Sequence, residues 1–224
     1  MTDYSDKQAF IELMVDQKVL RFGEFELKSG RRSPYFFNLG AISDGTALAA
    51  LGEFYAQAMV DNGLECDVLF GPAYKGIPIA VAMGVALARR GRGMGIGVAF
   101  DRKEAKDHGE GGVLVGAGLA GRRVLLVDDV VTDAATKRQG ARLISAQRGE
   151  LAGVLIALDR QEKLDGEETA FAALQSGLGV PVRSIATLQD VISWLDSAGA
   201  GIGERDVLAA SIRAYRDRYC VLDS

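Results

Sequence analysis

Val124-Leu-Leu-Val-Asp-Asp-Val-Val-Thr132 decides the fold, because an apolar run ends here in two adjacent carboxylates. Such a run is typical of a strand buried on both faces, as in parallel sheets. A helical pattern follows it. Ligands of open parallel sheets bind beyond the carboxyl ends of strands, and a helix start offers unpaired N–H groups to phosphate. The layout therefore indicates a ligand site, although Asp128 and Asp129 could instead only cap the next helix.

Further apolar runs extend this pattern along the chain, at residues 68–70, 96–100, 151–158 and 182–186. Before the first of these runs, Leu48, Leu51, Tyr55 and Met59 recur every three or four positions, and Ile77, Ala80, Gly84 and Leu87 do so between the first two runs. Strands that alternate with helices predict an α/β fold with a central, mainly parallel sheet flanked by helices.

The sequence before the first expected parallel strand has a different pattern. Residues 21–27 alternate in polarity, and Lys28, Ser29 and Gly30 give a turn signal. Residues 34–38 contain three consecutive aromatic side chains. We therefore expect a small N-terminal antiparallel cap over the active site, contributed by residues 20–40. Residues 204–219 look helical, and without repeats or linkers we expect a single domain over residues 1–224.

Composition excludes several classes of function. With 26 basic and 30 acidic residues the net charge is −4, so we expect no nucleic-acid partner. No apolar stretch is long enough for a membrane helix and no secretory signal is visible, so we expect neither membrane nor export. Cys66 and Cys220 lie far apart in the sequence, and the chain has one histidine. This predicts free thiols in a cytoplasmic protein and no cysteine metal site.

One glycine motif is misleading. Gly116, Gly118 and Gly121 satisfy the G-x-G-x-x-G fingerprint of dinucleotide-binding proteins. That fingerprint needs a helix directly after its last glycine, and here a strand is expected to begin three residues later. We therefore do not expect a dinucleotide.

A charged segment lies between two expected strands. Residues 101–112 gather Arg102, Lys103, Lys106 and His108, with glycines at 109, 111 and 112. We expect these residues to form a long structureless loop. Its composition and its length suit a flap that closes over an anion. The alternative is a solvated, charge-balanced loop.

Three smaller features complete the candidate site. The turn at residues 70–78 carries Lys75 and is either a second phosphate cradle or an ordinary strand-to-helix turn. In the cap, Lys28, Phe36 and Phe37 offer a cation and flat apolar surface for an acidic ring, unless the phenylalanines belong to the core. Arg160 offers a fork for a carboxylate, although alone it reads as a surface arginine.

Together these motifs resemble the orotate phosphoribosyltransferase family over nearly the whole chain. The resemblance is carried by Arg21-Phe-Gly-Glu-Phe25, Leu27-Lys-Ser-Gly30, Ser33-Pro-Tyr-Phe-Phe-Asn38, Leu69-Phe-Gly-Pro-Ala-Tyr-Lys-Gly-Ile-Pro78, Arg102-Lys-Glu-Ala-Lys-Asp-His-Gly-Glu-Gly-Gly112, Val127-Asp-Asp-Val-Val-Thr132 and Leu158-Asp-Arg-Gln-Glu162. It implies the type I phosphoribosyltransferase fold. It also implies transfer of ribose 5-phosphate from 5-phosphoribosyl 1-pyrophosphate to orotate in pyrimidine (UMP) biosynthesis.

The resemblance also implies a cofactor, a partner and roles for residues. Mg²⁺ would be held mainly through the donor substrate near Asp128 and Asp129, and a homodimer would share flap residues between subunits. The implied catalytic residues are Asp128, Asp129, Lys103, Lys106 and His108. The implied donor-binding residues are Tyr74, Lys75, Arg102, Lys103, Lys106, His108, Asp128, Asp129, Val130, Val131, Thr132, Asp133, Ala134, Ala135 and Thr136, and the implied orotate-binding residues are Lys28, Phe36, Phe37, Thr132 and Arg160.

The phosphate loop departs from the family pattern. The family usually continues Thr-Ala-Gly-Thr-Ala, whereas this chain has Thr132-Asp-Ala-Ala-Thr136. The new Asp133 adds an anion beside a phosphate, Ala134 replaces a glycine, and Ala135 removes a hydroxyl donor. We expect weaker donor binding. Two alternatives are a catalytically weakened regulator that binds the donor and a phosphoribosyltransferase for another base.

Overall fold

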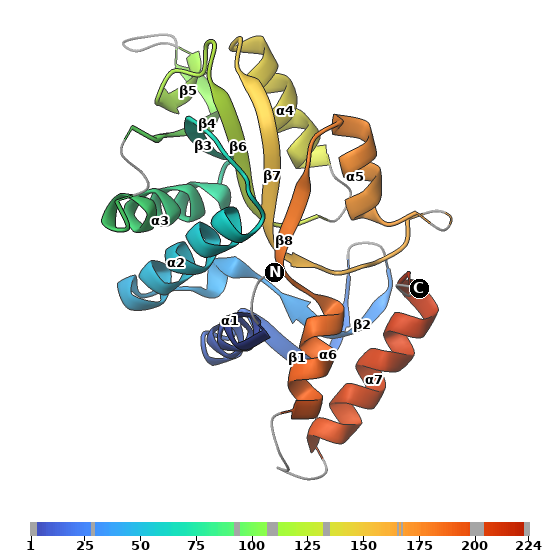
Figure 1. Ribbon diagram of the computed structural model, residues 1–224. Coiled ribbons are helices and arrows are strands. Elements are labelled where there is room, and N and C mark those ends of the chain that lie inside the picture. Colours follow the sequence, from blue (N-terminus) through green and yellow to red (C-terminus); the bar gives the residue numbers. More distant parts are fainter. Residues whose placement is uncertain are drawn as a thin grey trace.

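The computed structural model describes residues 4–27, 30–91, 95–106, 112–131, 135–164, 166, 168–197 and 204–221. Within them, one six-stranded sheet has the order β5-β4-β3-β6-β7-β8 (Figure 1). The strands β3, β4, β6, β7 and β8 are parallel, and β5 is antiparallel to β4. Their bounds are β3 Val68–Gly71, β4 Gly97–Lys106, β5 Gly112–Gly116, β6 Arg123–Val130, β7 Glu150–Asp159 and β8 Val182–Thr187. The predicted α/β fold is confirmed.

Two hydrophobic cores lie on opposite faces of this sheet, because successive strand residues point to opposite sides. Leu125 of β6 packs on the face covered by α2 (Gly45–Asp61) and α3 (Gly76–Arg89). Its neighbour Leu126 packs on the face covered by α4 (Ala135–Ala146) and α5 (Ala170–Leu178). Burial on both faces is why these strands read as continuous apolar runs.

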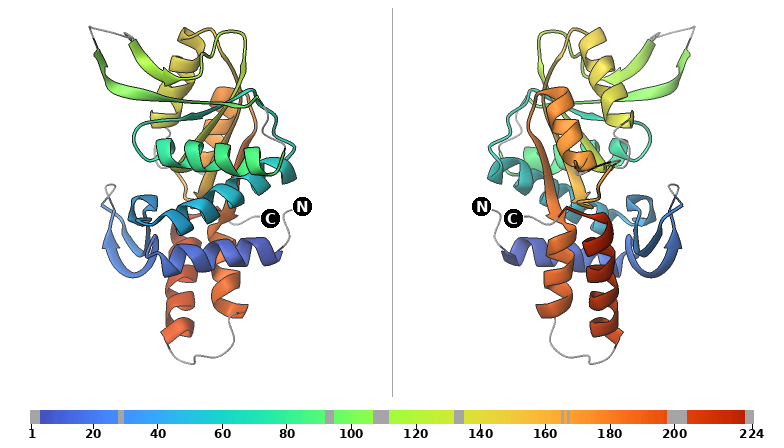
Figure 2. Two further views of the ribbon diagram at one scale, coloured as in Figure 1. Left: turned by 90° about the vertical axis from the view of Figure 1, so that its left-hand side faces the viewer. Right: turned by 90° about the vertical axis from the view of Figure 1, so that its right-hand side faces the viewer.

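A two-stranded antiparallel sheet forms the predicted cap. Strands β1 (Leu20–Glu26) and β2 (Arg32–Phe37) pair with Leu20 opposite Phe37. The cap lies beyond one end of the main sheet, beside the helices α1 (Tyr4–Asp16), α6 (Leu188–Ser197) and α7 (Glu204–Tyr219) (Figure 2). After β2, a short 3₁₀ helix η1 (Leu39–Ala41) leads into α2, whose start is capped by Asp44. Since the cap and the α2–α3 face share one core cluster, they pack as one body.

The charged segment is more regular than the sequence indicated. Strand β4 continues to Lys106 and β5 begins at Gly112, with Asp101 opposite Leu114. The expected long structureless loop is therefore wrong, because both of its ends are arms of a β-hairpin. The sequence did not predict the charged part of β4 as a strand, because charged residues interrupt the apolar pattern by which a strand is recognised.

The glycine fingerprint does not open a helix. Gly116 ends β5 with φ of 94°, and a Cβ there would lie 2.2 Å from the carbonyl oxygen of Val98. The chain then enters β6 at Arg123. Gly116 thus allows two backbones to approach closely, and the glycines are followed by the expected strand, where the dinucleotide fingerprint requires a helix.

Two further expectations concern cysteines and membranes. Cys66 and Cys220 are both free and buried. Among the helices of the described ranges, none has the length and apolar character needed to cross a bilayer.

Candidate active site

The two acids at the end of β6 are buried, and each is paired with a lysine. Asp128 and Asp129 are 5% and 6% exposed. Oδ2 of Asp128 lies 2.6 Å from Nζ of Lys137, and Oδ2 of Asp129 lies 2.6 Å from Nζ of Lys75. Since α4 begins only at Ala135, neither acid caps it, and that alternative is wrong.

Hydrogen bonds fix the backbone and carboxylate of Asp128. The N–H of Asp129 donates to Oδ1 of Asp128 at 2.9 Å, and Oη of Tyr55 donates to the Asp128 carbonyl at 2.8 Å. Burial raises the pKa of the Asp128 carboxyl, the charge of Lys137 lowers it, and the negative charge of Asp129 adds to the rise. Burial also raises the pKa of Tyr55 well above its ordinary value, so this hydroxyl keeps the proton that it donates.

The sequence reasoning missed Lys137. In the first turn of α4, this lysine is 5% exposed and shares a buried stripe with Gly140 and Ile144. Spacings of three and four residues put all of them on one helix face. A lysine within a buried stripe, shortly after an acid pair, is the signal that could have identified it.

The turn between β3 and α3 carries Lys75 to the acid pair. A Cβ on Gly71 would lie 2.1 Å from the carbonyl oxygen of Gly76, so this tight turn requires glycine. The N–H of Ala73 donates to Oδ1 of Asp101 on β4 at 2.6 Å, a contact that the sequence did not reveal. The side chain of Lys75 is 45% exposed although it is paired with Asp129. The turn thus supplies a solvent-accessible cation beside the acids.

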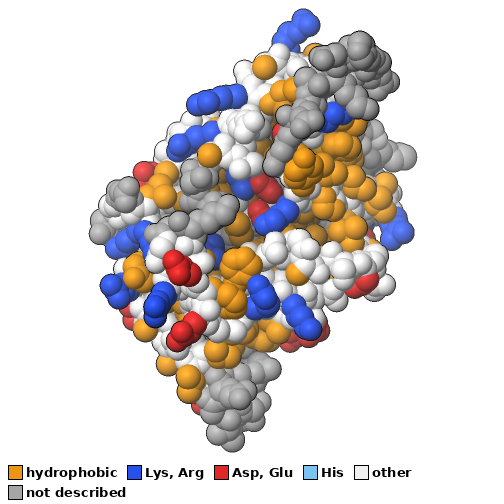
Figure 3. Space-filling model, turned by 180° about the vertical axis from the view of Figure 1, so that it is seen from behind, with side chains coloured by type: hydrophobic (Ala, Val, Ile, Leu, Met, Phe, Trp, Pro, Cys, Tyr) orange, Lys and Arg blue, Asp and Glu red, His pale blue; other side chains and the backbone are white. Residues whose placement is uncertain are grey.

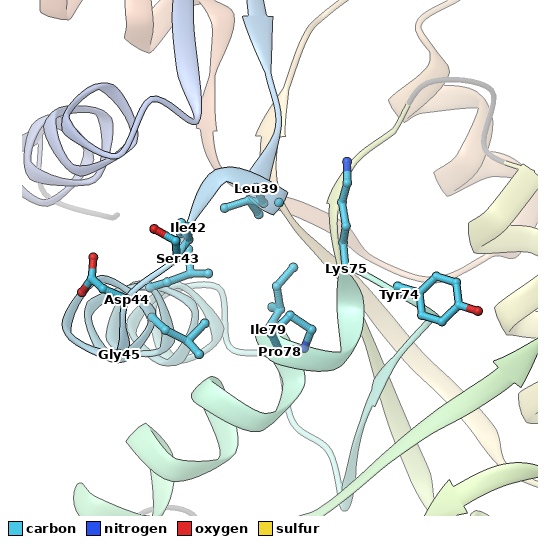
Figure 4. Close-up of a pocket in the computed structure, with 12 residues that line it drawn as sticks. Leu39, Ile42, Ser43, Asp44, Gly45, Tyr74, Lys75, Pro78 and Ile79 are labelled. Atoms are coloured by element: carbon cyan, nitrogen blue, oxygen red, sulfur yellow. The ribbon is translucent and has the colours of Figure 1, made fainter.

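A cavity of about 420 Å³ lies beside this turn. One wall comes from η1 and the start of α2, with Leu39, Ile42 and Asp44, and the other from α3 (Figure 4). Lys75 and Tyr74 line its edge, and the Tyr74 ring points away from the other labelled side chains. Of the predicted site residues, the cavity brings together these two.

The predicted aromatic surface of the cap is divided between two faces. Phe37 is 6% exposed and belongs to the core, as the alternative interpretation held. Phe36, its neighbour, is half-buried and stacks on Phe25 with 5.5 Å between ring centroids. Adjacent strand residues face opposite sides, so the two phenylalanines do not form one flat surface. Orotate binding by Phe36 and Phe37 stays a prediction, and Lys28 lies outside the described residues.

Arg160 is not a surface arginine. It follows β7 and is 7% exposed, with Nη2 lying 2.5 Å from Oε1 of Glu162. Its guanidinium carbon stands 4.5 Å from the ring centroid of Tyr35. The interpretation as an exposed side chain is therefore wrong, and the arginine fork is held within the protein.

The structure places only part of the flap and of the phosphate loop. Arg102 is half-buried on β4, and Lys103 and Lys106 lie on the same strand. Val130 ends β6 and Val131 is buried. Ala135 and Thr136 are exposed in the first turn of α4, at the end of the sheet that carries the acid pair. His108, Thr132, Asp133 and Ala134 lie outside the described residues, so their predicted roles stay predictions.

The chain is similar to known proteins over nearly its whole length. Residues 38–175 match the phosphoribosyl transferase domain. The orotate phosphoribosyltransferase of Chromohalobacter salexigens is 52% identical over 224 residues, which cover 96% of this chain and 95% of that protein. The chain belongs to the orotate phosphoribosyltransferase family. The family member of Vibrio cholerae is 50% identical over 213 residues, covering 95% of this chain and 97% of its own.

A solved structure leads to the same family. The 1.9 Å crystal structure of orotate phosphoribosyltransferase from Francisella tularensis has a TM-score of 0.82 and 36% identity, and the match covers 95% of this chain and 99% of that one. The orotate phosphoribosyltransferase family membership, the type I fold and the enzyme class expected from the sequence are confirmed. The two alternatives, a regulator and an enzyme for another base, find no support in these relatives.

Proposed function

We propose that this chain transfers the 5-phosphoribosyl group from 5-phosphoribosyl 1-pyrophosphate to orotate, producing orotidine 5′-monophosphate and pyrophosphate for pyrimidine biosynthesis. One observation carries the proposal: Asp128 and Asp129 are buried side by side at the carboxyl end of β6, with Lys75 on the adjoining turn. Family membership supplies the reaction, and this cluster supplies the charges that the reaction needs.

The acids and lysines suit the chemistry at ribose C1. The bond from C1 to the pyrophosphate oxygen breaks, and pyrophosphate leaves with the electron pair. A ring nitrogen of orotate bonds to C1 and releases its proton. Because C1 gains positive charge in between, carboxylates fixed near the ribose stabilise the transition state. Asp128 and Asp129 are proposed to bind the ribose hydroxyls and to act in this way.

The two lysines are proposed to play different parts. Lys75 is exposed enough to leave Asp129 and contact the departing pyrophosphate, together with Tyr74. The buried Lys137 stays with Asp128. One lysine thus follows the polyanion, while the other keeps an ionised acid in place.

Mg²⁺ is proposed as the metal, held mainly by oxygens of the donor. Within the described part of the chain, no group of three or more acidic, histidine or cysteine side chains is placed to hold a metal. Two carboxylates that already pair with lysines fit a metal that arrives with its substrate, since Mg²⁺ commonly uses one or two carboxylates plus phosphate oxygens. The ion would supply charge neutralisation for the pyrophosphate.

A homodimer is proposed to complete the site in the cytoplasm. The flap residues Arg102, Lys103, Lys106 and His108 would reach the neighbouring subunit's pyrophosphate. Hydrophobic side chains gather on the side of the molecule that carries α2 and α3 (Figure 3). On α3, Val81 and Val85 are 43% and 47% exposed. Four residues apart, they form one apolar face that a second copy could cover.

A panel of bases tests the proposed function. The purified protein is incubated with 5-phosphoribosyl 1-pyrophosphate, Mg²⁺ and, separately, orotate, uracil, adenine, guanine or hypoxanthine, and the nucleotide products are separated. We expect orotidine 5′-monophosphate from orotate and at most traces from the others. Efficient use of a purine in place of orotate would contradict the proposal.

A further inference from the structure

A glutamate joins Arg160 to the C-terminal helix. Oε1 of Glu162 accepts hydrogen bonds from Nε and Nη2 of Arg160, at 2.9 and 2.5 Å. The same oxygen accepts a third hydrogen bond from Oη of Tyr215 on α7, at 2.8 Å. One carboxylate oxygen thus connects the segment after β7 to Tyr215 of α7, which lies 53 residues further along the chain.

The cap holds the flat face of the same guanidinium. Tyr35 of β2, which is fully buried, lies under Arg160 with 4.5 Å from the guanidinium carbon to its ring centroid. The rings of Tyr35 and Tyr215 meet edge to face, 6.0 Å apart. Cap, sheet end and α7 therefore converge on Arg160. With its edge on Glu162 and its face on Tyr35, the guanidinium has little freedom to rotate.

Glu162 takes only the side edge of the guanidinium, which Nε and Nη2 form. Arginine carries five N–H donors, and Glu162 receives one from Nε and one from Nη2. The N–H groups that Glu162 does not use lie on Nη1 and on the outer side of Nη2. These form the end-on fork that matches a carboxylate. A buried ion pair adds little net stability compared with apolar packing, so orientation is the better explanation for it.

We propose that Glu162 and Tyr215 are positioning residues that aim the fork of Arg160 at the carboxylate of the acceptor base. The inference rests on the proposed function, since orotate supplies that carboxylate. It assigns to α7, which lies far from the acid pair in sequence, a role in recognising the base. Neither residue is expected to contact the phosphoribosyl donor.

Steady-state kinetics of hydroxyl and charge variants test this role. Tyr215→Phe keeps the ring and removes only the hydrogen bond, and Glu162→Gln keeps the shape and removes the charge. We expect each to raise the KM for orotate at least threefold and to leave the KM for the donor within twofold of the original. In the Glu162→Gln background, Tyr215→Phe should add little, because both act through one oxygen.

Tyr219→Phe is the matched control. It removes a hydroxyl from the same helix one turn later and keeps the ring contacts with Arg31 and Arg218, so orotate KM should not change. Orotate turnover by the unaltered protein with an unchanged orotate KM in both variants would overturn the inference alone. Equal rises in both KM values would also overturn it, since they would reveal a general structural role. A lack of orotate turnover by the unaltered protein would overturn the proposed function and this inference together.

Discussion

Nζ of Lys137 lies 2.6 Å from Oδ2 of Asp128, and both side chains are 7% exposed. The lysine therefore balances the charge of an acid that burial would otherwise drive towards its protonated form, as the raised pKa of Asp128 indicates. This buried ion pair ties the first turn of α4 to the end of β6. The segment that the sequence predicts to bind the phosphate lies between these two points along the chain.

Replacing the lysine should destabilise the protein and its site together. In Lys137→Met, Asp128 would be left as a buried charge without its partner, which typically costs about 3–5 kcal/mol. We expect the free energy of unfolding, measured with a denaturant, to fall by that amount. The KM for the donor should rise, because Asp128 becomes protonated more easily.

Arg138→Met is the control for this change, because Arg138 is the exposed neighbour on the same helix. An exposed substitution of this kind usually changes stability by less than about 0.5 kcal/mol. Equal stability of Lys137→Met and the unaltered protein would show that the ion pair contributes nothing.

Asp101 should control the donor affinity without contacting the donor. Its carboxylate accepts the N–H of Ala73 at 2.6 Å and so holds the turn that carries Lys75. A hydrogen bond to a charged group is worth about 1.5–3 kcal/mol, so Asp101→Ala should raise the donor KM about tenfold or more. Asp101→Asn, which keeps an acceptor oxygen, should have a smaller effect. Identical donor KM values for both variants and the unaltered protein would refute this role.

The altered phosphate loop should weaken donor binding. A single variant with four substitutions restores the family's usual loop and removes an anion beside the phosphate. The substitutions are Asp133→Ala, Ala134→Gly, Ala135→Thr and Thr136→Ala. We expect the KM for 5-phosphoribosyl 1-pyrophosphate to fall about tenfold in this variant, with little change in orotate KM. A donor KM that does not fall would mean that Thr132-Asp-Ala-Ala-Thr136 binds the phosphate as well as the usual loop.

Alkaline pH should destabilise the fold through a buried thiol. Burial, with the nearby charge of Asp67, raises the pKa of Cys66 from 9.0 to about 11. Both states are protonated at neutral pH. Above pH 9 the unfolded thiol loses its proton first, so the unfolded state is favoured until the folded thiol also ionises near pH 11.

Two pKa units correspond to about 2–3 kcal/mol of unfolding free energy, lost between pH 9 and 11. Denaturation of the unaltered protein and of Cys66→Ala across this range measures the difference. The slope with pH should be shallower in the variant. Parallel slopes would show that the thiol titrates alike in both states.

The exposed face of α3 should carry the dimer contact. Val85→Asp places a charge on this face, and we expect sedimentation to show more monomer, with orotate turnover falling in parallel. Val207→Asp is the matched control, because Val207 is 64% exposed on α7, away from α3. A dimer that survives Val85→Asp unchanged would place the contact elsewhere.

The sequence predicted elements whose local pattern matches their final environment. Residues 124–127 form a strand that is buried on both faces, so their apolar run directly indicates a buried strand. The cap and α7 were recognised for similar reasons, from alternation, a turn signal and helical character. In these segments local pattern and tertiary contacts agree.

The sequence could not predict contacts between segments that lie far apart along the chain. The pairs Lys137–Asp128 and Asp101–Ala73, and the link from Glu162 to Tyr215, depend on which strands and helices become neighbours in space. The arms of the β4–β5 hairpin were hidden because their charged residues lack an apolar strand pattern. The pattern of apolar residues along a sequence indicates which residues are buried, but it does not indicate which distant residues they contact.

The most direct test of the central claim follows the loss of orotate and the release of pyrophosphate in one reaction. The purified protein is mixed with orotate, 5-phosphoribosyl 1-pyrophosphate and Mg²⁺, beside a variant carrying both Asp128→Asn and Asp129→Asn. We predict that one pyrophosphate appears for each orotate consumed, and that the variant loses at least 99% of the rate. Pyrophosphate release without loss of orotate, or an undiminished rate in the variant, would contradict the account.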